Sequence, residues 1–228
     1  MRILVTNDDG IDSVGLHVLA RALLPYGEVT IVAPDSEYSG AGAALGALHL
    51  IRPEVHTTTV PGIDRSFAVT GTPALCVLFA RLGVFGPLPD LVVAGINPGA
   101  NVGRAVYHSG TIGATLTARS GGISGVAVSQ DVADLGVEGQ GWDDVLLGQH
   151  WDTAAHVAAT AVGGILADLP KEAVVLNLNV PNLPLAELKG WRQAEVGTVP
   201  PRALSTARLE PKEGHSGSFR VIMEYGQL

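Results

Sequence analysis

The sequence predicts a three-layer α/β/α fold with a mostly parallel β-sheet. Short apolar runs alternate with longer segments in which apolar residues recur at helical spacing. The apolar runs are continuous and do not alternate with polar residues, which is typical of parallel strands buried on both faces. Repeated alternation of this kind places helices on both sides of one sheet.

The first unit consists of a strand at residues 2–6, a helix at 13–24 and a second strand at 28–33. Gly27 ends the helical segment and Pro34 ends the second strand. Because the connection is helical, the two strands are expected to be parallel. The chain therefore begins with a β–α–β unit.

The same alternation continues to residue 180. Strands are expected at residues 66–70, 90–94, 125–129 and 173–180, and helices at 73–82, 109–119 and 151–169. Pro73 lies in the first turn of one helix, where its missing N–H costs nothing, and Asp152 is the expected N-cap of the last helix.

The pattern changes from about residue 190, where Pro200-Pro201 and scattered charges precede a lone strand candidate at 218–225. This tail has too few apolar residues for a core of its own. We therefore expect one domain over residues 1–228, with a core at about 1–185 and an arm or hairpin at about 186–228.

Composition narrows the functional class. Acidic residues outnumber basic ones 22 to 14, a net charge of −8, so duplex nucleic acid is not an expected partner. Cys76 is the only cysteine, which excludes an internal disulfide. The chain shows neither a signal-peptide pattern nor an apolar run that could span a bilayer. We expect a cytoplasmic protein that does not enter membranes.

Polar and glycine-rich segments follow three of the predicted strands. They are residues 7–10 (NDDG), 34–40 (PDSEYSG) and 95–103 (GINPGANVG). Ligands of open parallel sheets bind outside the carboxyl ends of the strands. The three segments are therefore expected to form one site.

Asp8 and Asp9 are adjacent carboxylates at the end of the first strand. Such a pair is repulsive unless a proton or a cation intervenes, and oxygen ligands of this kind suit Mg²⁺ or Mn²⁺. The alternative is an ordinary turn at Asp9-Gly10, with Asp12 or Ser13 capping the following helix.

A second signal lies at Ser109-Gly110-Thr111, at a predicted helix start. Free N–H groups in the first helical turn form an anion pocket, although a plain Ser N-cap explains the same residues. His108 beside it is a candidate acid for the leaving oxygen or a residue that packs against Tyr107. His150, His156, Asp143, Asp144 and Asp152 form a loose group that we interpret as a solvated loop and a helix cap.

A glycine-rich stretch at residues 40–46 superficially resembles a dinucleotide-binding loop. That loop must lie between the first strand and the first helix, where this chain has the negatively charged residues 7–10. A dinucleotide-dependent oxidoreductase is therefore only a rival hypothesis, and it would require NAD(P) or flavin binding without metal.

The motifs resemble those of the SurE family, the survival-protein nucleotidases. The matching blocks, in order and at similar spacing, are RILVTNDDG (2–10), Ser39-Gly40, Gly71-Thr72-Pro73, GINPGANVG (95–103) and HSGTIGA (108–114). The resemblance implies a Rossmann-like core with a C-terminal β-hairpin arm, exchanged between the subunits of a homodimer or homotetramer.

The resemblance also implies a divalent-metal-dependent nucleotidase or acid phosphatase. Such an enzyme hydrolyses nucleoside 5′- and 3′-monophosphates with a metal-activated water. Its metal, Mg²⁺ or Mn²⁺ with one ion per subunit, would lie on Asp8, Asp9, Ser39 and Asn97. Asp8, Asp9 and Asn97 would be catalytic, and the substrate would contact Ser39, Gly40, Asn97, Asn101, Ser109, Gly110 and Thr111.

The chain departs from the family pattern at Ala43, Leu75 and Thr117, where the family usually has His, Asp and Glu, and at its C-terminus. These departures leave the metal ligands in place. They motivate an alternative, a catalytically altered nucleotide-binding or regulatory protein that kept the pocket.

Overall fold

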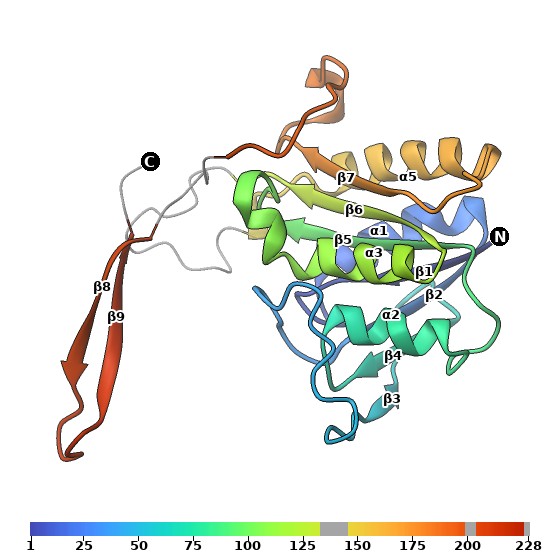
Figure 1. Ribbon diagram of the computed structural model, residues 1–228. Helices are drawn as coiled ribbons and strands as arrows, with labels where there is room; N and C mark the ends of the chain where they lie inside the picture. Colours follow the sequence, from blue (N-terminus) through green and yellow to red (C-terminus); the bar gives the residue numbers. More distant parts are fainter. Residues whose placement is uncertain (133–145, 199–203, 226–228) are drawn as a thin grey trace.

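In a computed structural model, which describes residues 1–132, 146–198 and 204–225, seven strands form one sheet (Figure 1). Their order is β3-β4-β2-β1-β5-β6-β7, and all pair in parallel except the edge strand β3. The strands are β1 (Arg2–Thr6), β2 (Glu28–Pro34), β3 (Val55–Thr57), β4 (Arg65–Val69), β5 (Leu91–Pro98), β6 (Ser124–Gln130) and β7 (Val175–Val180).

Helices cover both faces of the sheet (Figure 1). Helices α1 (Val14–Leu23) and α5 (Trp151–Ala167) pack together on one face, and α2 (Pro73–Arg81) and α3 (Gly110–Ser120) pack on the other. Short 3₁₀ turns are η1 (Leu24–Tyr26), η2 (Gly103–Tyr107) and η3 (Leu185–Glu187). The predicted three-layer α/β/α class is confirmed.

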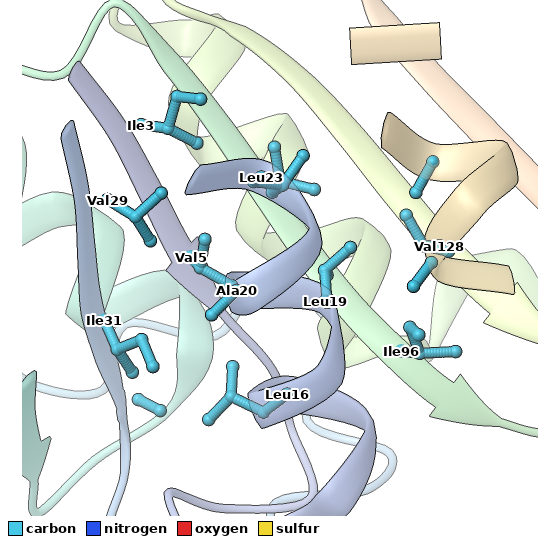
Figure 2. Packing of buried hydrophobic residues seen from close by; sticks show 14 of the residues in the cluster. Ile3, Val5, Leu16, Leu19, Ala20, Leu23, Val29, Ile31, Ile96 and Val128 are labelled. Carbon is cyan, nitrogen blue, oxygen red and sulfur yellow. The ribbon is translucent and has the colours of Figure 1, made fainter. Parts of the chain in front are cut away.

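Strand β1 lies in the middle of this arrangement and is buried on both faces. Ile3 and Val5 share one core cluster with Leu16, Leu19 and Leu23, whose side chains lie on the face of α1 that covers β1 (Figure 2). Leu4, between them, belongs to the second core cluster under α2 and α3. Successive strand residues point to opposite faces, so a centre strand covered on both sides must be apolar throughout.

Several features of the fold differ from the sequence-based expectation. Strand β3 was not predicted, because all three of its residues are exposed and give no burial pattern. Strand β5 continues past residue 94 through a bulge to Asn97 and Pro98, which pair with the end of β6. Helix α5 has His150 at its N-cap, so the expectation for Asp152 was wrong, and Asp152 lies in the first turn.

The C-terminal region forms an antiparallel hairpin of β8 (Leu204–Pro211) and β9 (Phe219–Tyr225), which extends away from the sheet (Figure 1). The lone strand candidate at 218–225 corresponds to β9, while β8 was not predicted as a separate strand. Four apolar side chains of the hairpin are more than half exposed: Leu209, Phe219, Val221 and Met223. Among the described residues, no helix is long and apolar enough to cross a membrane.

Candidate functional site

The segments that follow β1 and β2 meet the end of β5 at the carboxyl ends of these central strands. These strands are neighbours in the order β2-β1-β5, and parallel pairing brings their carboxyl ends together. Asp8 and Asp9 follow β1, Ser39 lies beyond β2, and Asn97 is the last residue but one of β5. The backbone N–H of Tyr38 donates to the carbonyl of Asp8 at 2.7 Å, which ties two of these segments together.

Asp8 is buried, with both carboxylate oxygens bonded to the start of α3. Oδ2 accepts from the backbone N–H of Gly110 at 3.1 Å, and Oδ1 accepts from the hydroxyl of Thr111 at 2.6 Å. Burial raises the pKa of Asp8, and the hydrogen bond from Thr111 opposes that rise. The expected metal pair and the expected phosphate segment are therefore in direct contact.

Asp9 is half-buried, and its Oδ2 has no hydrogen-bond partner among the described residues. Burial, followed by the charges of Asp8 and Glu37, raises the pKa of Asp9 to about 8. A cation beside this oxygen would satisfy it and lower that pKa. The residues present therefore fit a divalent metal.

Ser39 and Asn97 add neutral oxygens to the two carboxylates. The hydroxyl of Ser39 donates to Glu37 at 2.8 Å, and the amide nitrogen of Asn97 donates to the carbonyl of Gly99 at 2.7 Å. Both bonds use the donor and leave the oxygen lone pairs available. In the described parts of the chain no three His, Cys, Asp or Glu residues group as metal ligands, so a cation at this edge would depend on such neutral oxygens.

Ser109 is the N-cap of α3, and its hydroxyl accepts from the backbone N–H of Ile112 at 3.1 Å. The expectation that Ser109 caps this helix is confirmed. The side chain of Ser109 is thereby fixed. The N–H of Gly110 and the hydroxyl of Thr111, in the first turn of α3, both donate to Asp8.

Gly110 is required by the close approach of α3 to Asp8. A Cβ atom at this position would lie 2.8 Å from both Cβ and Oδ2 of Asp8. We expect Gly110→Ala to lower the free energy of unfolding by about 1–3 kcal/mol and to reduce activity, because α3 must move away from Asp8. Denaturant unfolding and phosphate release measure the two effects.

Gly164 is the matched control for Gly110→Ala, since it also lies in a helix but has open space where a Cβ would be. Gly164→Ala should stabilise the protein by about 0.5–1 kcal/mol. Equal effects of the two substitutions would contradict the steric argument.

Asn101 is buried and is held by residues of β6 and β7 that the sequence did not single out. Its backbone N–H donates to Oδ1 of Asn179 at 2.8 Å, and its side-chain amide donates to the hydroxyl of Ser129 at 2.9 Å. The amides of Asn177 and Asn179 donate to its carbonyl at 3.0 and 3.3 Å. The one signal in the sequence was the alternate placement of two Asn residues in an apolar strand.

We expect Asn179→Ala to lower the free energy of unfolding by about 1 kcal/mol and to raise KM for substrate, because the loop that carries Asn101 loses two hydrogen bonds. Asn179→Asp keeps the acceptor for the N–H of Asn101 and should recover part of the loss. Urea unfolding and initial rates measure both variants, and identical behaviour of Ala and Asp would contradict this role.

The remaining sequence candidates have separate places. His108 is exposed, and its carbonyl accepts from the backbone N–H of Gly42 at 3.0 Å. Leu75 and Thr117 are buried in α2 and α3. His150 and His156 lie at the start of α5, whereas Asp143 and Asp144 fall outside the described residues.

Comparison with known proteins assigns the family. The profile of the family described as "Survival protein SurE" matches residues 3–201. The chain belongs to the SurE family. This range includes every candidate site residue from Asp8 to Thr111.

Individual SurE proteins show the same likeness. The chain is 36% identical over 212 residues to a "5'/3'-nucleotidase SurE" of Erwinia tasmaniensis, a match over 93% of this chain and 76% of that protein. It is 38% identical over 215 residues to a "5'-nucleotidase SurE" of Coxiella burnetii, over 94% and 76%. The crystal structure of the SurE protein from Aquifex aeolicus superposes with a TM-score of 0.74 and 30% identity, over 99% of this chain and 82% of that one.

Proposed function

We propose that this SurE-family protein is a divalent-metal-dependent phosphomonoesterase that hydrolyses nucleoside 5′- and 3′-monophosphates. The observation that carries the proposal is the unpartnered Oδ2 of Asp9, which lies beside the carboxylate of Asp8 at the rim that faces the start of α3. The SurE proteins of Erwinia tasmaniensis and Coxiella burnetii are named as nucleotidases, which supports this substrate class.

Asp8, Asp9, Ser39 and Asn97 are the proposed ligands of one Mg²⁺ or Mn²⁺ per subunit. Such an ion, when bound, neutralises phosphate charge and lowers the pKa of the attacking water. The water oxygen bonds to phosphorus, the ester P–O bond breaks, and the leaving oxygen takes up a proton to give nucleoside and phosphate.

The protein's own groups hold the reactants in place. Asp8 is fixed by Gly110 and Thr111, so its carboxylate keeps one orientation during the reaction. The dipole of the first turn of α3 favours the phosphate oxygens, and phosphate would share the N–H of Gly110 and the hydroxyl of Thr111 with Asp8. Ser39, Gly40, Asn97 and Asn101 are the other proposed substrate contacts.

One observation favours a second candidate, a nucleotide-binding protein without turnover. Both carboxylate oxygens of Asp8 already accept hydrogen bonds, from the N–H of Gly110 and from the hydroxyl of Thr111. A bound phosphate would therefore compete with Asp8 for these two donors. Phosphate release from AMP, GMP and p-nitrophenyl phosphate, with Mn²⁺, Mg²⁺ or EDTA, separates the two. Metal-dependent turnover that Asp9→Asn abolishes supports the enzyme, whereas tight nucleotide binding without turnover supports the second candidate.

We also propose that the subunits associate as a homodimer or homotetramer through the hairpin β8–β9. Its exposed apolar side chains, among them Phe219 and Val221, are what an intersubunit contact would bury. Light scattering on the wild type and on Val221→Glu tests this, and an unchanged mass would contradict it. The single, buried thiol of Cys76 is compatible with the proposed cytoplasmic location.

A further inference from the structure

A pocket of about 380 Å³ lies between the loop after β2 and the start of α2. Its walls are mainly apolar or aromatic, and among the described residues Arg52 is the one charged residue in the lining. The volume is near the lower end of the range for small-molecule sites, and it suits a single ring system. The other lining residues that bear on the occupant are Tyr38, Ile51, Thr70, Thr72 and Leu75.

The pocket adjoins the proposed metal site through the chain itself. Tyr38 forms part of its wall, and its backbone N–H is bonded to the carbonyl of Asp8. Ser39 is the next residue. Tyr38 therefore connects the pocket wall directly to the proposed ligands Asp8 and Ser39.

Residues 42–44, between Tyr38 and Leu45 of the lining, contact both α3 and the start of α2. A Cβ on Gly113 would lie 2.2 Å from the carbonyl oxygen of Gly42, so the chain presses directly on α3 there. Ala44 lies two residues after Gly42, and its carbonyl accepts from the hydroxyl of Thr72 at 2.5 Å. The wall of the pocket is thus held at both ends, by α3 and by the N-cap of α2.

The chemistry of the lining selects the occupant. Leu75, Ile51 and Tyr38 offer apolar and aromatic surface for the faces of a planar ring. The hydroxyls of Thr70 and Thr72 are already used by Asp35 and Ala44. The guanidinium of Arg52 has only donors, so it favours a ring edge that presents acceptors.

We propose that this pocket binds the base of the leaving nucleoside, with the acceptor edge of the base toward Arg52. The inference rests on the proposed function and specifies its substrate. Guanine presents two acceptors, N7 and O6, where adenine presents one acceptor and one donor. The enzyme therefore prefers 6-oxopurine monophosphates to AMP, and both to phosphomonoesters with small leaving groups.

The first test fills the pocket. In the Mn²⁺-loaded full-length protein, Ile51→Trp should lower the ratio of kcat/KM for GMP to kcat/KM for glycerol phosphate by about tenfold or more, since the base loses its place. Val84→Trp is the matched control, because Val84 is an exposed residue of the loop between α2 and β5, outside the lining. An unchanged ratio in Ile51→Trp, or an equal fall in Val84→Trp, would overturn the proposal.

The second test removes the charge. Arg52 is exposed, so Arg52→Gln should fold normally, and it should lower the ratio of kcat/KM for GMP to that for AMP by about tenfold. A GMP-to-AMP ratio that does not change would refute the role of Arg52.

Failure of the proposed function has a different signature. If the wild type releases no phosphate from glycerol phosphate, GMP or AMP with any metal, the phosphomonoesterase proposal is wrong. Calorimetric titration with guanosine then still tests the pocket, since Ile51→Trp should weaken guanosine binding by about tenfold and Val84→Trp should not. Guanosine binding that is equal in all three proteins would overturn the pocket assignment.

Discussion

Replacing Asp8 by Asn is expected to lower phosphate release from nucleoside monophosphates by about a thousandfold. The substitution removes one negative charge from the proposed metal ligands. It also leaves a single side-chain acceptor where two donors, the N–H of Gly110 and the hydroxyl of Thr111, now bond two oxygens. One of these donors would face an NH₂ group, so the start of α3 would shift as well.

Asp12→Asn is the matched control for Asp8→Asn. It makes the same chemical change four residues later, at an exposed side chain. Steady-state rates with Mn²⁺ should show near wild-type activity for Asp12→Asn, and circular dichroism should show that both variants fold. An active Asp8→Asn protein, or equal losses in the two variants, would contradict the assignment of Asp8.

Removing the metal is expected to abolish activity and to make stability depend on the charge of Asp9. The pKa of Asp9 is raised from 3.8 to about 8 in the folded, metal-free protein. A raised carboxyl pKa means that folding favours the protonated form. The stabilisation from this group is complete below the unfolded pKa, and it is lost as pH rises through about 8.

The metal-free protein should therefore show a Tm that falls between pH 5 and pH 9 more steeply than that of Asp9→Asn. A bound cation favours the charged form, so Mn²⁺ should raise Tm more at pH 8 than at pH 5. Thermal unfolding with EDTA or Mn²⁺ across this range measures both effects. If Mn²⁺ stabilises Asp9→Asn as much as the wild type, Asp9 is not a ligand.

Much of the fold follows from local burial. The continuous apolar residues of β1 and β2 predict buried parallel strands, and the spacing in α1 predicts a helix with one apolar face. Strand β3 gave no such signal, because its backbone pairs at an exposed edge while its side chains are in solvent. The extension of β5 through Asn97 was not predicted either. A bulge between Ala94 and Asn97 interrupts the apolar pattern, and Asn97 and Pro98 still pair with β6 beyond it.

The candidate site, like the fold, was predicted only in part from the sequence. Asp8 and Asp9 were identified from residue type and from their place after a strand, whereas Ser39 and Asn97 were assigned as ligands by the resemblance to the SurE family. Glu37, Asn177 and Asn179 were missed. Asn177 and Asn179 bond the backbone of Asn101, which is more than 70 residues away in the chain. Glu37 accepts from Ser39 within the same loop, where an exposed polar residue is ordinarily solvated. Only the packed structure shows that these side chains have partners.

The sequence by itself determined the order of the buried strands and the helices and the oxygen-rich chemistry at the strand ends, because burial periodicity and residue type are local properties. The tertiary structure decided which of these groups meet. Asp8 and Gly110 are 102 residues apart in the chain, yet they lie within hydrogen-bond distance. That contact exists because parallel pairing places β1 beside β5, and a residue without a side chain lets α3 approach Asp8.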